Sequence, residues 1–409
     1  MRAALAAALL LACLALPAAA SAQSAAPELR GAKAAIVIEA STGQVAYARN
    51  PRVRRPIAST TKMMTALVTL QRADLDEVFR ASSYRPAPIE SQIGLEPRER
   101  MAVRDLLRGL LLASGNDAAM ALAVGVSGSR TGFVRSMNAQ ASELGLSNTH
   151  FANPIGLDQQ GNYSTASDLA RLALVLRRDE FARETMDRRR ATLQTGTHQR
   201  TIINRNTLVR TVDDVNGVKT GHTQGAGYVL VGSATRNGIT VVSVVMGEPS
   251  EAARDADSLA LLRYGLNSFS RRTGLRKGAV LARPKLAFRD ENVDLVASSG
   301  VEQVVRRGQR FAVDVQGVPS ELRGPIPQGA RIGTAVVSLA GRVVARVPLV
   351  TAAPVTKASL GDRAKDALGG PVLPLLVAAL AVGSLLFMVL RRRAARRRRA
   401  VRRRERRAV

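Results

Sequence analysis

Cysteine is nearly absent from this chain of 409 residues, since the only one is Cys13. Because Cys13 lies in an apolar leader, we expect no disulfide, cysteine nucleophile or thiolate metal site in the mature protein. Histidine is also scarce: His150, His198 and His222 are the only ones, and none belongs to a zinc-binding motif. A Gly-x-Ser-x-Gly turn, typical of many Ser-His-Asp hydrolases, is missing. The sequence therefore predicts a protein without a metal or other cofactor.

The composition does not indicate disorder. Apolar residues make up 46% of the chain, and the 33 glycines and 17 prolines are modest numbers for this length. Such a chain is long enough to bury the core of one large domain or two ordinary domains. No repeat of fixed period and no Gly-rich phosphate loop stands out.

The N-terminal end predicts export from the cytoplasm. A charged start is followed by the apolar run 3–16 and by small residues at 20–22, which is the pattern of a secretory signal over 1–22. An alternative interpretation takes residues 10–13 as a lipoprotein motif that would leave Cys13 lipidated at the mature N-terminus. The apolar run continues past Cys13 to a better cleavage site, which favours the secretory signal.

The C-terminal end predicts a membrane anchor. Residues 371–390 carry no charge, and about 20 such residues are needed to cross a bilayer as a helix. The tail 391–409 holds twelve arginines and one glutamate, a charge of +11 out of a formal total of +28. Because such clusters stay on the cytoplasmic side, we expect a single-pass protein of the cell membrane with an extracytoplasmic body.

The excess of positive charge has more than one interpretation. The arginine tail alone would suit nucleic acid, but the preceding span explains where the arginines begin, so we expect no nucleic-acid partner. The body remains strongly basic without the tail. A basic extracytoplasmic body suits the anionic polymers of a cell envelope, or simply has a well-solvated surface; composition does not separate these two.

The pattern of apolar residues predicts an α+β body, an α/β sandwich, over 28–270. Strands are expected near both ends of this body, and helices between them. Such an order favours a sheet shared by the first and last strands, flanked by helices. The expected strands are 34–40, 44–48, 227–234 and 239–246, and the expected helices begin at 59 and cover 103–112, 117–126, 168–176 and 254–269.

The region 275–350 has a different pattern of apolar residues from the body. Its short alternating segments around turns such as Ala340-Gly341 are typical of a small all-β domain. No set of residues with catalytic spacing occurs in it. Residues 351–370 have the composition of a linker to the membrane span.

Three short motifs in the body carry the candidate chemistry. They are Ser59 to Lys62 (Ser-x-x-Lys), Ser114 to Asn116 (Ser-x-Asn) and Lys219 to Gly221 (Lys-Thr-Gly). Each is weak alone, because Ser-x-x-Lys often begins an ordinary helix and the others are common in loops or as helix caps. Together and in this order they indicate a serine acyl-enzyme.

The context of the first motif suits nucleophilic catalysis. Ser59 begins a predicted helix, where free backbone N–H groups favour developing negative charge. Lys62 follows three residues later, so both side chains lie on one helix face. A lysine that burial and nearby cations keep neutral would remove the serine proton, and we expect Lys219 to be such a cation.

The other two motifs suit substrate binding and proton transfer. Ser114 and Asn116 are expected in a loop between two helices, where Ser114 would relay a proton and Asn116 would hold a substrate amide. Helix capping is the alternative for this pair. Thr220 and Gly221 precede a predicted strand, so we expect an edge strand that receives a peptide substrate, with Gly221 permitting close approach.

The motifs and their surroundings resemble the low-molecular-weight penicillin-binding proteins of the D-alanyl-D-alanine carboxypeptidase family. The resemblance covers nearly the whole chain and implies a β-lactamase/transpeptidase-like catalytic domain, with 275–350 similar to the family's C-terminal β domain. The further segments that carry it are 151–158, 163–169, 204–206 and 217–223.

The resemblance also implies a role for each candidate residue. Ser59 would form the acyl-enzyme, Lys62 would be its general base, and Ser114 would relay protons. Asn116 would bind the peptide, and the backbone N–H groups of Ser59 and His222 would form the oxyanion hole. Lys219 and Thr220 would hold the substrate carboxylate, with support from Arg205.

The substrate implied by the resemblance is a peptidoglycan stem peptide ending in D-Ala-D-Ala, from which the enzyme releases the terminal D-alanine during cell-wall biogenesis. β-Lactams would inhibit by acylating Ser59. Two departures from the family pattern are a glycine, Gly115, where alanine is usual, and a membrane span where many members have an amphipathic helix.

Alternative functions stay open at this point. A D,D-endopeptidase or transpeptidase would use the same acyl-enzyme with a different bond or acceptor. A β-lactamase of the same fold is less favoured, because no clear Glu-x-x-x-Asn motif occurs and the β domain is extra. A catalytically silent wall-binding scaffold is disfavoured by the intact motifs.

Overall fold

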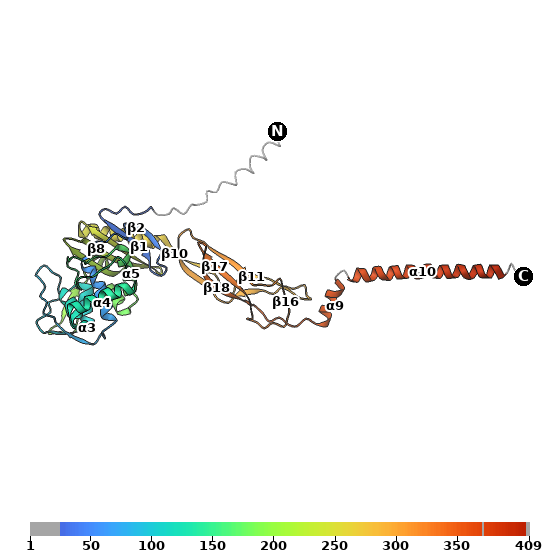
Figure 1. Cartoon of the computed structure of the whole chain (residues 1–409), viewed down its shortest axis with the longest axis horizontal. Helices are drawn as coiled ribbons and strands as arrows, with labels where there is room; N and C mark the ends of the chain where they lie inside the picture. The colour runs from blue at the N-terminus through green and yellow to red at the C-terminus, as the bar shows by residue number, and fades with distance from the viewer. Residues whose placement is uncertain (1–24, 370–371, 406–409) are drawn as a thin grey trace, which may run out of the picture. The chain divides into compact units, whose positions relative to one another are not determined.

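The computed structural model describes residues 25–369 and 372–405. The predicted signal segment 1–22 and Cys13 lie outside these residues. The chain divides into two compact units, one formed by Met1–Arg272 with Val304–Gly308 and the other by Thr273–Gln303 with Gln309–Val409 (Figure 1). Each unit is described by itself below.

The first unit is built on a five-stranded antiparallel sheet with the strand order β2-β1-β9-β8-β7. The first strand of the chain lies beside the last strand of the unit's sheet, as the sequence predicts. Strand β7 forms one edge, as expected of the Lys-Thr-Gly segment. The strands are β1 Ala34–Glu39, β2 Val45–Arg49, β7 Val215–Thr223, β8 Gly227–Arg236 and β9 Ile239–Glu248.

The central strands of this sheet are covered on both faces. In β1, Ala34 and Ile36 belong to one hydrophobic core, whereas Ala35 and Val37 belong to another. Helix α5, Ala166–Leu176, packs on one face, and helix α8, Glu251–Ser268, packs on the other. Two-sided burial explains why β1 reads as an uninterrupted apolar run rather than an alternating pattern.

A layer of helices lies on the α5 side of the sheet, where Figure 1 shows α3, α4 and α5 gathered together. Its central helix α1 is buried from Lys62 to Thr69. The predicted helix 103–112 is two elements, because its last turn widens into a π-helix. The helical segments are η1 Ala58–Thr61, α1 Lys62–Leu70, α2 Val103–Arg108, η2 Gly109–Ala113, α3 Asn116–Ser127, α4 Arg130–Glu143, α6 Glu180–Asp187 and α7 Thr207–Thr211.

Two short hairpins complete the first unit. One joins β3 to β4 and the other joins β5 to β6. Their strands are β3 Val78–Arg80, β4 Arg100–Ala102, β5 Arg190–Leu193 and β6 Arg200–Ile203.

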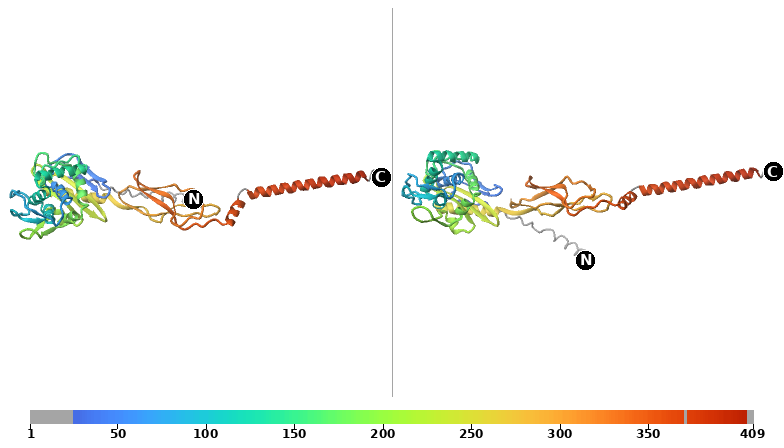
Figure 2. Two further views of the ribbon diagram at one scale, coloured as in Figure 1. Left: turned by 60° about the horizontal axis from the view of Figure 1, so that its bottom comes forward. Right: turned by 90° about the horizontal axis from the view of Figure 1, so that it is seen from below.

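The second unit has the predicted all-β core. Figure 2 shows its strands, coloured yellow-orange to orange, and the five-stranded sheet has the order β11-β13-β18-β17-β15. The β17–β18 turn contains Ala340 and Gly341, both with positive φ, as a tight hairpin turn requires. Its strands are β11 Val280–Ala282, β12 Lys285–Leu286, β13 Leu295–Ala297, β15 Phe311–Gln316, β16 Glu321–Leu322, β17 Arg331–Leu339 and β18 Arg342–Thr351. Two further strands, β10 Phe269–Leu275 and β14 Val301–Arg306, contain residues of both units.

Two helices follow the β core. The segment 351–370, expected to be a linker, contains helix α9, Leu360–Gly369, so it is not without regular structure. Its start is capped, because the Ser359 Oγ accepts from the Asp362 N–H at 3.1 Å. Helix α10, Val372–Glu405, continues from the apolar segment into the arginine-rich tail, and its part Pro374–Arg398 is long and apolar enough to cross a membrane (Figure 2).

Candidate active site

Ser59 lies in a tight turn that directly precedes α1. The sequence predicts that Ser59 begins an α-helix; the structure places it in the 3-10 turn η1, and α1 begins three residues later at Lys62. Ala58, just before it, has a φ of 47°, a strained conformation for alanine. Functional sites often hold such strain where the surroundings fix the backbone.

Two glycines make room for this turn. A Cβ at Gly156 would lie 2.1 Å from the Ala58 carbonyl oxygen, and one at Gly221 would lie 3.0 Å from the Ser59 nitrogen. The sequence predicts that Gly221 lets the substrate backbone approach closely. The structure shows that glycine here also lets β7 pack against the Ser59 backbone. The turn that carries Ser59 is therefore held between β7 and the segment that contains Gly156.

Lys62 is fully buried and donates three hydrogen bonds. Its Nζ contacts the Ser59 Oγ at 3.0 Å, the Asn116 Oδ1 at 2.6 Å and the Ile155 carbonyl oxygen at 2.5 Å. These three acceptors satisfy all donors of an ammonium group. The first motif therefore forms the predicted contact between the alcohol and the amine.

Burial lowers the pKa of Lys62 to about 7, despite the opposing effect of the Glu90 charge. The positive charge of Arg205 lowers it as well, and Asp117 raises it. The charges of Lys62 and the neighbouring Lys219 disfavour each other, and the structure adds Arg205 as a further cation that acts on Lys62. A lysine with such a pKa is substantially neutral at physiological pH and is able to accept a proton.

Lys219 is also buried, and its pKa is lowered well below its usual range. Burial is the main cause, followed by the positive charges of Lys62, Arg205 and Arg254. Its Nζ donates to the Thr220 carbonyl oxygen at 2.9 Å. Because two neighbouring buried amines disfavour a shared positive charge, Lys219 is not an ordinary surface cation.

The second motif lies where η2 meets α3. Ser114 ends η2 with a φ of 63°, in the left-handed region that few serines adopt. Asn116 is the first residue of α3, so the predicted loop consists of only Ser114 and Gly115. Neither side chain caps α3. The Asn116 Oδ1 instead accepts from Lys62, and its Nδ2 donates to Glu90 at 2.6 Å.

A groove of about 640 Å³ opens beside these residues. The predicted residues Ser59, Ser114, Arg205, Thr220, Gly221 and His222 line it. The remaining three predicted residues, Lys62, Asn116 and Lys219, are buried next to it and do not line it. The His222 ring stacks on Tyr228, another lining residue, with ring centres 4.0 Å apart. The structure thus brings all nine predicted site residues to one place.

Sequence reasoning missed several residues of the site, of which Arg254 and Glu90 matter most. Arg254 lines the groove from α8, and its guanidinium pairs with Glu251 and with Asp255, each at 2.7 Å. In the sequence, Glu251 and Arg254 look like an ordinary surface ion pair three residues apart. Only the tertiary structure, which buries Arg254, distinguishes it from a solvated side chain.

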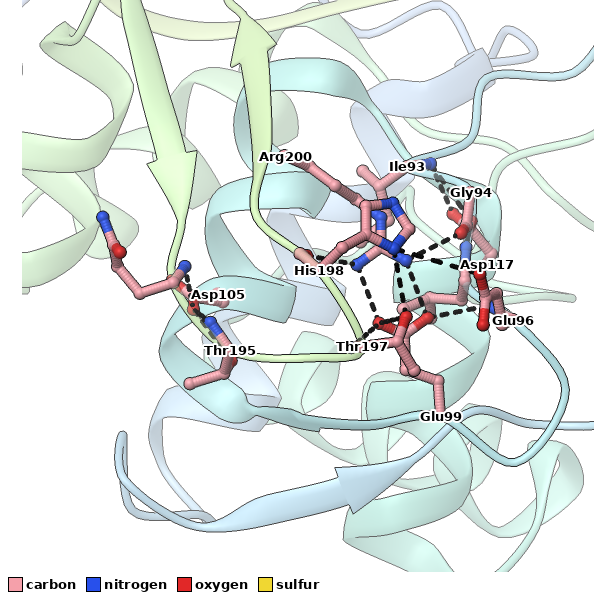
Figure 3. A network of polar contacts seen from close by, with 12 residues as sticks. Ile93, Gly94, Glu96, Glu99, Asp105, Asp117, Thr195, Thr197, His198 and Arg200 are labelled. Carbon is pink, nitrogen blue, oxygen red and sulfur yellow. Dashed lines mark hydrogen bonds and ion pairs between the residues drawn. The ribbon is translucent and has the colours of Figure 1, made fainter.

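A network of buried carboxylates supports the segments around Asn116 (Figure 3). Asp117 accepts from the backbone N–H groups of Ile93 and Leu95, each at 3.0 Å, which ties the segment after Glu90 to the start of α3. Glu99 pairs with Arg200 at 2.7 Å. Burial opposes ionisation of Glu99, but hydrogen bonds from Arg200 and the backbone outweigh it and lower its pKa to about 2.

Comparison with known sequences places the chain in a single family. The family model described as D-alanyl-D-alanine carboxypeptidase matches residues 20–250, and the penicillin-binding protein 5 C-terminal domain matches 269–357. The carboxypeptidase DacF of Bacillus subtilis is 32% identical over 351 residues, covering 83% of this chain and 89% of that protein. DacA of Escherichia coli is 34% identical over 334 residues, covering 78% and 82%.

Solved structures agree with the sequences. Penicillin-binding protein 5 from Haemophilus influenzae has a TM-score of 0.61 and 31% identity, covering 81% of this chain and 99% of that one. The Streptomyces K15 DD-transpeptidase has a TM-score of 0.57 and 33% identity, covering 59% and 98%. The two family models, for the carboxypeptidase and for the C-terminal domain, together match most of the chain. The chain belongs to the D-alanyl-D-alanine carboxypeptidase family of serine peptidases.

Proposed function

We propose that this carboxypeptidase works through an acyl-enzyme on Ser59. Neutral Lys62 takes the proton of the Ser59 hydroxyl, and the Ser59 oxygen attacks the carbonyl carbon of the penultimate D-alanine. The bond to the terminal D-alanine breaks, and Ser114 passes a proton to the leaving nitrogen. Water then attacks the ester, which releases the shortened stem peptide and regenerates the Ser59 hydroxyl.

One observation carries this proposal: the Lys62 amine lies 3.0 Å from the Ser59 oxygen and has a pKa of about 7. A serine hydroxyl needs an adjacent base to become a nucleophile. A fully exposed lysine would be protonated at neutral pH and would not serve. Burial therefore supplies the reactivity that the sequence motif only implies.

The proposed substrate contacts follow from the lining of the groove. Thr220 on the edge strand β7, with Arg205 and Arg254 nearby, suits the terminal carboxylate of the peptide. The backbone N–H groups of Ser59 and His222 would stabilise the negative oxygen that forms on the attacked carbonyl. Asn116 would bind the peptide, and Lys219 would help to hold its carboxylate. Gly221 permits the close packing of β7 against the Ser59 backbone.

The partners proposed are peptidoglycan stem peptides ending in D-Ala-D-Ala and, as inhibitors, β-lactams. We further propose that α10 holds the protein in the cell membrane, with the catalytic unit outside and the arginine-rich end in the cytoplasm. The twelve arginines after the apolar segment support this orientation, because such residues are retained on the cytoplasmic side.

The test uses the full chain in detergent and two readouts. We expect release of D-alanine from a stem peptide ending in D-Ala-D-Ala, and a covalent penicillin adduct that mass spectrometry assigns to Ser59. The variant Ser59→Ala should lose both, while its thermal unfolding stays unchanged. A folded natural chain that neither releases D-alanine nor forms the adduct would refute the proposal, as would an adduct on another residue.

A further inference from the structure

Glu90 contacts Asn116 of the second motif but belongs to none of the three motifs itself. It lies in the segment between β3 and β4, and its neighbours Ile89 and Ser91 line the groove. Its carboxylate accepts hydrogen bonds from the Asn116 Nδ2 at 2.6 Å, from the Ala87 N–H at 3.2 Å and from the Tyr84 hydroxyl. Three donors therefore converge on one carboxylate beside the groove.

The contact with Glu90 determines which way the Asn116 amide points. A carboxylate only accepts, so it requires the amide nitrogen of Asn116 on its side. The Asn116 oxygen then faces Lys62, whose ammonium form only donates. With the amide reversed, acceptor would face acceptor at Glu90, and donor would face donor at the ammonium form of Lys62. Glu90 thus orders the amide that the catalytic lysine contacts.

The charge of Glu90 also acts on Lys62. Burial would raise the pKa of Glu90, but hydrogen bonds from Tyr84 and Asn116 outweigh it and lower the pKa, so the group is a carboxylate at neutral pH. Arg205 and Asp117 also act on Lys62, and the charges of Lys62 and Lys219 disfavour each other. Glu90 is the larger of the two negative influences, and it opposes the effects of burial and Arg205.

We propose that Glu90 is a positioning residue that fixes the Asn116 amide and, through its charge, sets the protonation of the catalytic lysine. The proposal rests on the acyl-enzyme mechanism proposed above. A continuous line of hydrogen bonds runs from Tyr84 through Glu90, Asn116 and Lys62 to Ser59. These hydrogen bonds connect the groove segment 89–91 to Ser59, so the same short segment lines the groove and sets the pKa of Lys62.

Two substitutions separate the two parts of this role. Glu90→Gln keeps an oxygen that accepts from Asn116 but removes the charge, whereas Glu90→Ala removes both. The matched control is Glu96→Gln, which makes the same change in net charge at an exposed carboxylate of the same segment. The readout is the second-order rate of Ser59 acylation by labelled penicillin between pH 5 and pH 9, because acylation needs neutral Lys62.

We expect Glu90→Gln to move the acid limb of the acylation profile to lower pH, by about half a pH unit or more. The reason is that removing a negative charge disfavours protonated Lys62, so the base stays neutral to lower pH. Glu90→Ala should also lower the maximal rate by about tenfold, because the Asn116 amide is no longer ordered. Glu96→Gln should leave the profile of the natural chain unchanged.

The proposal is overturned if Glu90→Gln, with thermal unfolding like that of the natural chain, gives the same acid limb, or if Glu90→Ala acylates at the natural rate. A shift of equal size in Glu96→Gln would also overturn it, because the effect would then be one of net charge alone. If Glu90→Ala does not fold, the near-isosteric Glu90→Gln decides. Absence of any Ser59 adduct in the natural chain would instead refute the acyl-enzyme mechanism.

Discussion

The two units bury very different kinds of side chains. The first unit buries two lysines, Lys62 and Lys219, and several carboxylates. In the described part of the second unit, Thr351 is the one polar side chain that is buried. Buried charges cost stability unless they are paired, so their concentration in one unit marks where stability is exchanged for chemistry. The second unit is an ordinary apolar β core, and changes in the two units should separate activity from stability.

The largest expected effect is that of Lys62→Met on activity. Because Lys62 is the proposed general base, its loss should reduce Ser59 acylation by about 10²–10⁴-fold. The measurement is the rate of labelling by penicillin at pH 7.5. A variant that acylates within threefold of the natural rate would contradict the assignment of Lys62 as the base.

The same variant should change how stability depends on pH. The pKa of Lys62 is about 7 in the folded chain against 10.5 normally, so the unfolded chain binds more protons between these values. Stability of the natural chain should therefore rise between pH 7 and pH 10 relative to Lys62→Met, by roughly 2–4 kcal/mol. Urea unfolding at both pH values measures this difference, and parallel curves would contradict it.

A core substitution in the second unit should lower stability and leave activity unchanged. Leu349 is fully buried in the β core, so Leu349→Ala should destabilise that unit by about 2–5 kcal/mol. The release of D-alanine at 20 °C should stay near the natural rate, because the groove is lined only by residues of the first unit. A large loss of activity at a temperature where both units stay folded would show that the comparison is too simple.

Gly221→Ala should impair activity through packing alone. The new methyl group would lie 3.0 Å from the Ser59 nitrogen and 3.1 Å from the Ile57 carbonyl oxygen. Such overpacking costs about 1–3 kcal/mol, and it displaces either the turn that carries Ser59 or β7. We expect acylation to fall by roughly tenfold or more, as a displaced nucleophile would require. Acylation at the natural rate would mean that the turn adapts freely.

The smallest expected effect concerns a buried acid, Glu248, that belongs to none of the three motifs. Burial, then the charge of Asp257 and a hydrogen bond with it, raise the pKa of Glu248 to about 8. The folded chain thus binds more protons here than the unfolded chain between pH 4.5 and pH 8, so stability falls as the pH rises through this range. Glu248→Gln should remove about 2 kcal/mol of that fall.

The measurement for Glu248→Gln is thermal unfolding at pH 5 and pH 9. The variant should unfold at a higher temperature than the natural chain at pH 9, and the gap should narrow at pH 5. A constant gap at both values would show that Glu248 is ionised in the folded chain throughout.

The sequence predicts the parts of the fold that depend on local patterns. The β1–β2 hairpin, the edge position of β7 and the contact of Ser59 with Lys62 all follow from alternation, turn residues and helical spacing. The sequence predicts Gly221 at the site. The reason that this position must be glycine is the close approach of β7 to η1, and no local sequence pattern indicates that approach.

The electrostatics of the site were less accessible to sequence reasoning. Arg205 joins Lys219 as a cation that acts on Lys62, and no motif in the sequence links Arg205 to this lysine. Glu90 and Arg254 reach the site from segments whose sequences look like solvated surface. Which charges face one another depends on tertiary packing, and a linear motif does not contain that information.

The central claim is that burial makes Lys62 the base for Ser59 near neutral pH. The most direct test is the pH dependence of Ser59 acylation by penicillin in the full chain, with the adduct mapped at each pH. We predict an acid limb near pH 7, set by the pKa of about 7. A rate that is flat from pH 5 to pH 9, or one that rises only as the pH approaches 10, would contradict the account.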